Sequence, residues 1–224
     1  MSVAKNYQEI QQQIENACNK VGRNKEDITV IAVTKYATIE TAKEAVSAGI
    51  QHLGENRLEG FQEKKEAIGE EVSWHFIGTL QSRKVKDLIH DIDVLHSLDR
   101  KSLAKEINKR AEKTVPCFVQ VNVSEEESKH GLAVAEVKPF IESLSKYENI
   151  EVVGLMTMAP HTEDEEILRE TFQRLRRLRD EIMELNLSYA PCNYLSMGMS
   201  NDFHIAIEEG ATHIRVGSKL VGSY

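Results

Sequence analysis

The sequence predicts an α/β fold, a single (β/α)8 barrel of the TIM type. Short β-rich runs recur along the chain, and several are apolar on both faces, which is typical of parallel strands that are covered on both sides. Helical patterns fill the gaps between them. Dividing 224 residues among eight units leaves 28 residues each, enough for one strand, one helix and two short loops. No linker rich in Pro, Gly or Ser interrupts the pattern, so residues 1–224 are expected to form one domain.

Eight candidate strands carry this prediction. They are "ITVIAVT" (28–34), "HLGEN" (52–56), "SWHFIG" (73–78), "VLHSL" (94–98), "PCFVQVNV" (116–123), "EVVGLMTM" (151–158), "CNYLSMG" (192–198) and "THIRVG" (212–217). An open doubly wound sheet is the alternative. No G-x-G-x-x-G follows the first strand, as such nucleotide-binding sheets often have, and a closed barrel is therefore preferred.

The clearest helical pattern follows Thr162, where apolar residues recur at steps of three and four from Leu168 to Leu185. Thr162 together with Glu165 predicts a capping box at its start. A further helix at residues 5–20 precedes the first strand and is expected to cover one end of the barrel. Other helices are predicted at 38–49, 99–113 and 133–149.

Composition and charge exclude several classes of protein. A net charge of -8 gives no general attraction to nucleic acid or to an anionic membrane. No apolar run is long enough to span a bilayer, and the N-terminus lacks a basic segment followed by an apolar core, so a cytoplasmic protein is expected. The arginines of "RLRRLRDEIMEL" (174–185) have acidic neighbours at helical spacing, which favours a solvated, ion-paired helix face over a nucleic-acid site.

The three cysteines, Cys18, Cys117 and Cys192, are widely spaced and include no C-x-x-C. An odd, scattered set fits neither a disulfide framework nor a zinc site. We expect three small residues in buried or half-buried places, and no metal.

Lys35 stands at the end of the apolar first strand, where a charge costs desolvation free energy unless it is paired, neutralised or chemically used. Glu55 is one candidate partner for simple pairing. The other interpretation is chemical, because a desolvated amine can form a Schiff base with a carbonyl. The active face of such a barrel lies at the carboxyl ends of its strands, where "GENR" (54–57) and "GTLQSRK" (78–84) are also expected.

Two loops at the same face are rich in glycine and serine, "SMGMS" (196–200) and "RVGS" (215–218). Loops after strands seven and eight commonly bind phosphate in these barrels, through backbone N–H groups and a helix N-terminus. Each loop alone is typical of a plain turn. The two together, opposite a strand-end lysine, make a phosphorylated ligand a serious candidate.

Several long motifs resemble the pyridoxal phosphate homeostasis proteins, single-domain relatives of the N-terminal barrel of alanine racemase. The resemblance runs from about Tyr7 to Gly222 and rests on "VTKY", "LGENR", "WHFIGTLQSRK", "ESKHGL", "GLMTMAP" and "LSMGMSNDFHIAIEEGATHIRVGS". It implies that Lys35 binds pyridoxal 5'-phosphate covalently as an internal aldimine and that Arg215 faces the pyridine nitrogen. It also implies a contact near the ring from Asn56 and phosphate contacts from Ser196, Ser200, Gly217 and Ser218.

The implied site suggests binding without efficient catalysis. Arginine stays protonated, so Arg215 would leave the pyridine nitrogen unprotonated and weaken the cofactor as an electron sink. Racemisation also needs a second base opposite Lys35, which the resembling racemase takes from a second domain. Here the sequence ends at Tyr224, and a terminal tyrosine is a poor candidate for that base because chain ends are usually mobile.

We therefore expect a non-enzymatic protein that buffers pyridoxal phosphate and hands it to apo-enzymes, with Lys84 and Lys129 as candidate amines for transfer. A weak pyridoxal-dependent racemase or lyase is the alternative. A barrel that binds another phosphorylated metabolite without covalent chemistry is a third hypothesis. A monomer is expected, with a weak dimer as the alternative.

Overall fold

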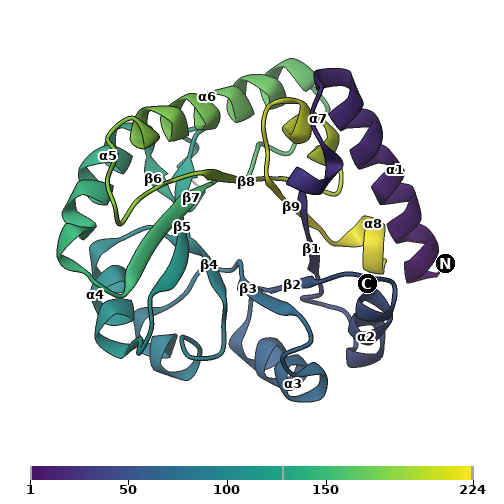
Figure 1. Cartoon of the computed structure of the whole chain (residues 1–224), viewed down its shortest axis with the longest axis horizontal. Helices are drawn as coiled ribbons and strands as arrows, with labels where there is room; N and C mark the ends of the chain where they lie inside the picture. The colour runs from purple at the N-terminus through teal and green to yellow at the C-terminus, as the bar shows by residue number, and fades with distance from the viewer. Residues whose placement is uncertain (1, 128, 223–224) are drawn as a thin grey trace.

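Eight parallel strands close into a barrel in the computed structural model, which describes residues 2–127 and 129–222 (Figure 1). Neighbouring strands follow the order β4-β3-β2-β1-β9-β8-β7-β5, and pairing of β5 with β4 closes the ring. The predicted (β/α)8 barrel is thereby confirmed. The strands are β1 (Thr29–Val33), β2 (His52–Glu55), β3 (Ser73–Phe76), β4 (Val94–Leu98), β5 (Val115–Asn122), β7 (Ile150–Met156), β8 (Tyr194–Met199) and β9 (His213–Val216).

A ninth strand, β6 (Leu132–Ala133), was not expected from the sequence. It pairs in parallel with the end of β5, with Leu132 opposite Val121. The chain reaches this position through Gly131, whose φ is +113° and where an added Cβ would lie 2.8 Å from the Asn122 nitrogen. Only glycine fits such a close approach without displacing β5.

The helices form the outer ring, but they differ in length. They are α1 (Val3–Val21), α2 (Ile39–Ser47), α3 (Leu58–Ile68), α4 (Lys101–Arg110), α5 (Val134–Glu142), α6 (Glu165–Met183), α7 (Phe203–Glu208) and α8 (Ser218–Val221), with 3-10 turns η1 (Lys25–Asp27), η2 (Ser82–Asp87) and η3 (Ser143–Lys146). The third unit has only the 3-10 turn η2, and the last two helices are short. None of the described helices is long and apolar enough to cross a bilayer.

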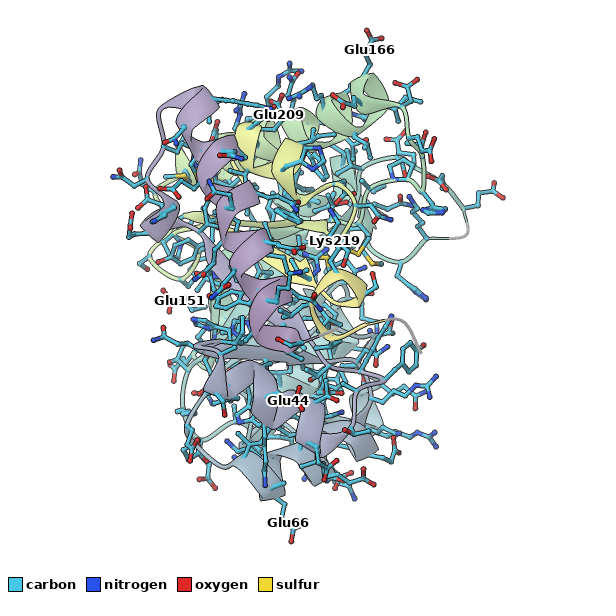
Figure 2. The ribbon with its side chains drawn as sticks, turned by 90° about the vertical axis from the view of Figure 1, so that its right-hand side faces the viewer. Glu44, Glu66, Glu151, Glu166, Glu209 and Lys219 are labelled. Atoms are coloured by element: carbon cyan, nitrogen blue, oxygen red, sulfur yellow. The ribbon has the colours of Figure 1, made fainter. Side chains whose placement is uncertain are left out.

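Helix α1 lies in the outer ring, beside α7 and α8, and does not cover an end of the barrel as expected (Figure 1). Asn6 Nδ2 donates to the carbonyl of Leu220 in α8 over 2.8 Å, and Arg23 donates to the carbonyl of Ile207 in α7 over 2.7 Å. Figure 2 shows α1 crossing the molecule next to the short helix that bears Lys219. Because α7 and α8 are short, they leave apolar surface that the long α1 covers.

The start of α6 differs from the predicted capping box of Thr162 and Glu165. Asp164 is the N-cap, and its Oδ1 accepts from the backbone nitrogens of Glu166 at 2.9 Å and Ile167 at 3.4 Å. Thr162 instead accepts from the Asp164 nitrogen at 3.1 Å. The carboxylate is the better cap because it satisfies two free N–H groups and is stabilised by the positive end of the helix dipole.

The arginines of α6 form an ion-paired face, as predicted. Arg179 pairs with Asp180 over 2.7 Å, and Arg174 and Arg176 approach Glu125 and Glu209 at 3.8 and 3.9 Å. The same arginines also donate to backbone carbonyls of neighbouring loops. These arginines therefore give α6 a charged outer face and also attach the helix to neighbouring loops of the barrel.

Candidate functional site

A cavity of about 1170 Å³ opens at the carboxyl ends of the strands. It is larger than the roughly 300–1,000 Å³ of most small-molecule sites. Segments that follow β1, β2, β3, β7, β8 and β9 line it, so the topology brings together residues from both halves of the chain. Six of the predicted site residues contribute to its wall: Lys35, Asn56, Ser200, Arg215, Gly217 and Ser218.

Lys35 lies two residues beyond β1 and extends from the cavity wall as an exposed side chain. Its ammonium lies 5.0 Å from the centroid of the Tyr36 ring. Lys35 is therefore not desolvated, and the alternative in which it simply pairs with Glu55 is contradicted, because Glu55 pairs elsewhere. An exposed ammonium incurs little desolvation cost, so the charge of Lys35 needs no buried partner here, and its position at the strand end is as predicted.

Glu55 is instead part of a buried ion pair with Lys64, a residue that the sequence analysis missed. The Lys64 Nζ and Glu55 Oε1 atoms are 3.0 Å apart, and Thr34 Oγ1 donates to the same oxygen over 2.5 Å. A signal was present in the sequence, since Lys64 shares the buried face of α3 with Phe61 and Ile68. A lysine at such a position needs an acidic partner.

The last two loops form a cradle of hydroxyl and backbone N–H groups. Ser200 Oγ accepts from the backbone nitrogens of Gly217 at 3.2 Å and Lys219 at 3.4 Å, which joins the loop after β8 to the start of α8. Ser218 is exposed in the cavity wall between them. Ser200 accepts in both of these bonds and so keeps its own O–H, which together with the Ser218 hydroxyl is suited to an anionic group such as a phosphate.

Asp202 organises this cradle and was not predicted. Its Oδ1 accepts from the Met199 nitrogen over 2.6 Å, which shapes the loop after β8. Burial raises the pKa of the Asp202 carboxyl, while the bond from the Met199 N–H and the charge of Arg215 act in the opposite direction. The signal available in the sequence was the run Ser200-Asn201-Asp202 immediately before a helix, which is typical of N-caps and local turns.

Arg215 occupies the floor of the cavity and is only 4% exposed. Nη1 donates to Ser196 Oγ over 2.5 Å, and Nη2 donates to the Thr157 carbonyl over 2.9 Å. Burial lowers the pKa of Arg215 to about 10, which still leaves the guanidinium charged at neutral pH. The predicted phosphate contact Ser196 is fully buried behind Arg215 and does not line the cavity.

Asn56 lies at the cavity wall after β2, where its Oδ1 is buried and has no hydrogen-bond partner among the described residues. Buried amide oxygens are nearly always bonded, so this atom is suited to a donor supplied by a ligand. Gly78 makes its position possible, because an added Cβ at Gly78 would lie 2.4 Å from the Asn56 carbonyl oxygen.

The remaining candidate amines lie away from the cavity wall. Lys84 pairs with Glu59 over 3.2 Å, and Lys129 pairs with Glu126 over 2.8 Å. Neither contributes to the described lining. Tyr224, weighed as a second base, lies outside the described residues. Among residues 2–127 and 129–222, no three His, Cys, Asp or Glu side chains are arranged to bind a metal ion.

The parallel barrel, with a lysine after its first strand and an anion cradle after its last two, defines an alanine racemase-type barrel, and residues 4–224 match the family model of the alanine racemase N-terminal domain. The chain is 40% identical over 227 residues to the pyridoxal phosphate homeostasis protein of Aquifex aeolicus, covering 99% of this chain and 98% of the relative. It belongs to the family of pyridoxal phosphate homeostasis proteins.

Two solved structures extend this likeness. A protein described as unknown from Bifidobacterium adolescentis superposes with a TM-score of 0.93 at 31% identity, covering 98% of this chain and 94% of that one. PipY of Synechococcus elongatus, solved with pyridoxal phosphate bound, gives a TM-score of 0.81 at 28% identity, covering 94% of this chain and 100% of PipY. The fold is therefore shared along nearly the whole length of these relatives.

Proposed function

We propose that this protein binds pyridoxal 5'-phosphate reversibly and acts in homeostasis of that cofactor, as a carrier and buffer. The observation that carries the proposal is the shared cavity, which brings the amine of Lys35 to the same space as the cradle of Ser200, Gly217 and Ser218. The names of the curated relatives and the ligand of the PipY structure support it.

The residues of the cavity fit this cofactor. When bound, pyridoxal phosphate supplies an aldehyde that forms a reversible carbon–nitrogen bond with an amine. Lys35 is the proposed attachment point, because it is the lysine of the cavity wall. The cradle would bind the phosphate, and the unpartnered Asn56 Oδ1 offers an acceptor to the ligand.

Arg215 is the proposed partner of the ring nitrogen, and it would limit the chemistry of the site. A guanidinium donates hydrogen bonds and does not release its proton at neutral pH, so it favours an unprotonated nitrogen. Ser196, expected to contact phosphate, is assigned here to holding Arg215, because its hydroxyl is already bonded to that side chain. Without a protonated ring the electron sink is weak, and we propose no efficient catalysis.

Reversible attachment would let the protein keep free aldehyde concentration low and release the cofactor to apo-enzymes. We propose that such enzymes are transient partners of a monomer in the cytoplasm. Transfer is tested by mixing loaded protein with an apo-enzyme and following recovery of that enzyme's activity. Turnover of D- or L-amino acids at ordinary enzymatic rates in a chiral assay would defeat the carrier role.

Attachment is tested with purified protein and added pyridoxal phosphate. We expect an absorbance band that borohydride reduction converts into a stable mass increase on the peptide containing Lys35. Lys35→Ala should lose the band and the added mass, whereas the matched controls Lys84→Ala and Lys129→Ala should keep both. Unchanged affinity and labelling in Lys35→Ala would overturn the attachment point and favour a non-covalent phosphate site.

A further inference from the structure

The interior of this barrel holds an unbroken chain of hydrogen bonds between side chains of five strands. His52 Nδ1 lies 3.0 Å from His75 Nε2, and His75 Nδ1 lies 2.8 Å from His96 Nε2. His96 Nδ1 in turn lies 2.8 Å from Ser196 Oγ, which accepts from Arg215. Barrel interiors are usually filled with branched apolar side chains, so this polar chain requires an explanation.

Two of the three histidines in this hydrogen-bond chain, His75 and His96, are buried and neutral, whereas His52 is half-buried. His75 is 1% exposed and His96 is not exposed at all. Burial lowers the pKa of both imidazoles well below the ordinary value, and the positive charge of Arg215 also lowers that of His96. Each ring is therefore a neutral imidazole with one donor nitrogen and one acceptor nitrogen.

Arg215 determines the direction of every bond in this chain. A guanidinium can only donate, so Ser196 Oγ accepts from it and is left with its own O–H to place. The other described partner of that hydroxyl is His96 Nδ1, and we assign this nitrogen as the acceptor because the buried O–H would otherwise have no partner. His96 consequently carries its proton on Nε2 and donates to His75 Nδ1, and His75 donates from Nε2 to His52 Nδ1.

The same chain explains how a buried arginine is stabilised without a carboxylate in contact with it. Its two described acceptors, Ser196 Oγ and the Thr157 carbonyl, are neutral. Asp202 acts on Arg215 through its charge, without a hydrogen bond between them among the described contacts. In this hydrogen-bond chain, each O–H or N–H dipole has its negative end towards Arg215, which stabilises the positive charge of the guanidinium. Aligned hydrogen bonds also polarise one another and so strengthen this effect.

We propose that His96 and His75 are positioning residues of the cofactor site, which act through Ser196 to hold the guanidinium of Arg215 as a fixed, charged donor at the cavity floor. The part of this proposal that concerns the ligand rests on the proposed function. The part that concerns the histidine tautomers does not, because it follows from the protein alone.

The tautomers are tested by nitrogen-15 NMR of the histidine rings in the ligand-free protein. Between about pH 6 and 8, we expect His75 and His96 to be neutral and protonated on Nε2. Arg215→Met should produce a measurable population of the Nδ1-protonated form of His96, because Ser196 is then free to donate or accept. Nδ1 protonation in the wild type, or an unchanged tautomer in Arg215→Met, would overturn the direction that we assign.

The effect on the site is tested with two substitutions of His96 that differ in the atom they preserve. His96→Asn keeps an acceptor where Nδ1 stood, whereas His96→Gln loses that acceptor and keeps a donor towards His75. We expect His96→Gln to weaken pyridoxal phosphate binding about tenfold, which is the loss of roughly one hydrogen bond, and to shift the absorbance maximum of the bound cofactor. His96→Asn should stay close to wild type.

His213 provides the matched control. Its ring centroid lies 6.4 Å from that of His96. Its Nδ1 is hydrogen-bonded to Thr212, which is not a member of the histidine hydrogen-bond chain. His213→Gln should leave affinity and spectrum unchanged. Equal losses in His96→Asn and His96→Gln would indicate a packing role and contradict the proposal. If wild-type protein binds no pyridoxal phosphate, the proposed function fails, and the NMR measurement still decides the tautomers.

Discussion

The Nζ of Lys64 and the Oε1 of Glu55 lie 3.0 Å apart beneath the site, and the two side chains are 6% and 0% exposed. The same carboxylate accepts from Thr34, the residue immediately before Lys35. The buried pair therefore connects α3, the end of β2 and the segment that bears Lys35. Its integrity matters to the fold and to the placement of Lys35.

Removal of one partner from this pair is expected to destabilise the protein severely. Lys64→Met leaves the Glu55 carboxylate buried without its counterion, which costs about 3–5 kcal/mol in the free energy of unfolding. Urea denaturation measures the loss. Adding Glu55→Gln to Lys64→Met should restore part of it, and the control Glu59→Gln, which removes an exposed ion pair of the same helix, should change little. A wild-type midpoint for Lys64→Met would contradict the importance of the pair.

Gly78→Ala is expected to displace the backbone of Asn56 in the cavity wall. The new Cβ would lie 2.4 Å from the Asn56 carbonyl oxygen and 2.7 Å from its Cα, both of them backbone atoms that cannot turn aside. We expect a loss of about 1–3 kcal/mol in stability, typical of overpacking, together with weaker pyridoxal phosphate binding. Equilibrium dialysis and urea denaturation measure the two effects. Thr79→Ala, at the exposed next position, should keep wild-type stability; equal effects of the two substitutions would count against the contact with Asn56.

Acid should destabilise this protein before most carboxylates titrate. Burial lowers the pKa of His213 to about 3, and lowers those of His75 and His96 well below the ordinary value. The unfolded chain therefore binds more protons than the folded protein once the pH falls below about 6.5, and each histidine then costs about 1.4 kcal/mol per pH unit. Stability should be complete above that pH and decline below it.

Urea denaturation at about pH 7.5, 6.5 and 5.5 tests this linkage, since that range brackets the unfolded histidine pKa. His213→Gln should reduce the slope of stability against pH by the contribution of one histidine. Constant stability across the range would show that the interior histidines are not held neutral.

The thiols are expected to be inert in the folded protein. Cys18, Cys117 and Cys192 are free and buried, which confirms their predicted placement. Burial raises the pKa of all three, that of Cys192 to about 12, so the reactive thiolate is scarce. A chromogenic disulfide reagent should label none of them rapidly in native protein and all three after unfolding. Fast labelling of the native protein would contradict the buried placement.

Local patterns in the sequence were sufficient for the architecture. Each predicted strand overlaps an observed one, and the rule that parallel strands present their carboxyl ends at one face put Lys35 and the loops of Ser200 and Gly217 together. The predicted cap of α6 was wrong because several neighbouring polar residues could take that position. The predicted location of α1 was wrong because it depends on the apolar surface that the short helices α7 and α8 leave uncovered. The hydrophobic periodicity of a segment reveals neither the choice of capping residue nor the surface that another helix leaves uncovered.

The sequence by itself determined the closed α/β barrel, the strand-end lysine and the two cradle loops, because hydrophobic periodicity and glycine-serine turns are properties of consecutive residues. Only the tertiary structure decided which side chains are buried and which partner each one takes. Glu55 meets Lys64 in place of Lys35, and Ser196 lies behind Arg215 at the end of a histidine chain, away from the cavity wall. Such choices follow from strand register and from the packing of helices on the barrel, which bring together residues far apart in the sequence, such as His96 and Ser196, a hundred positions apart.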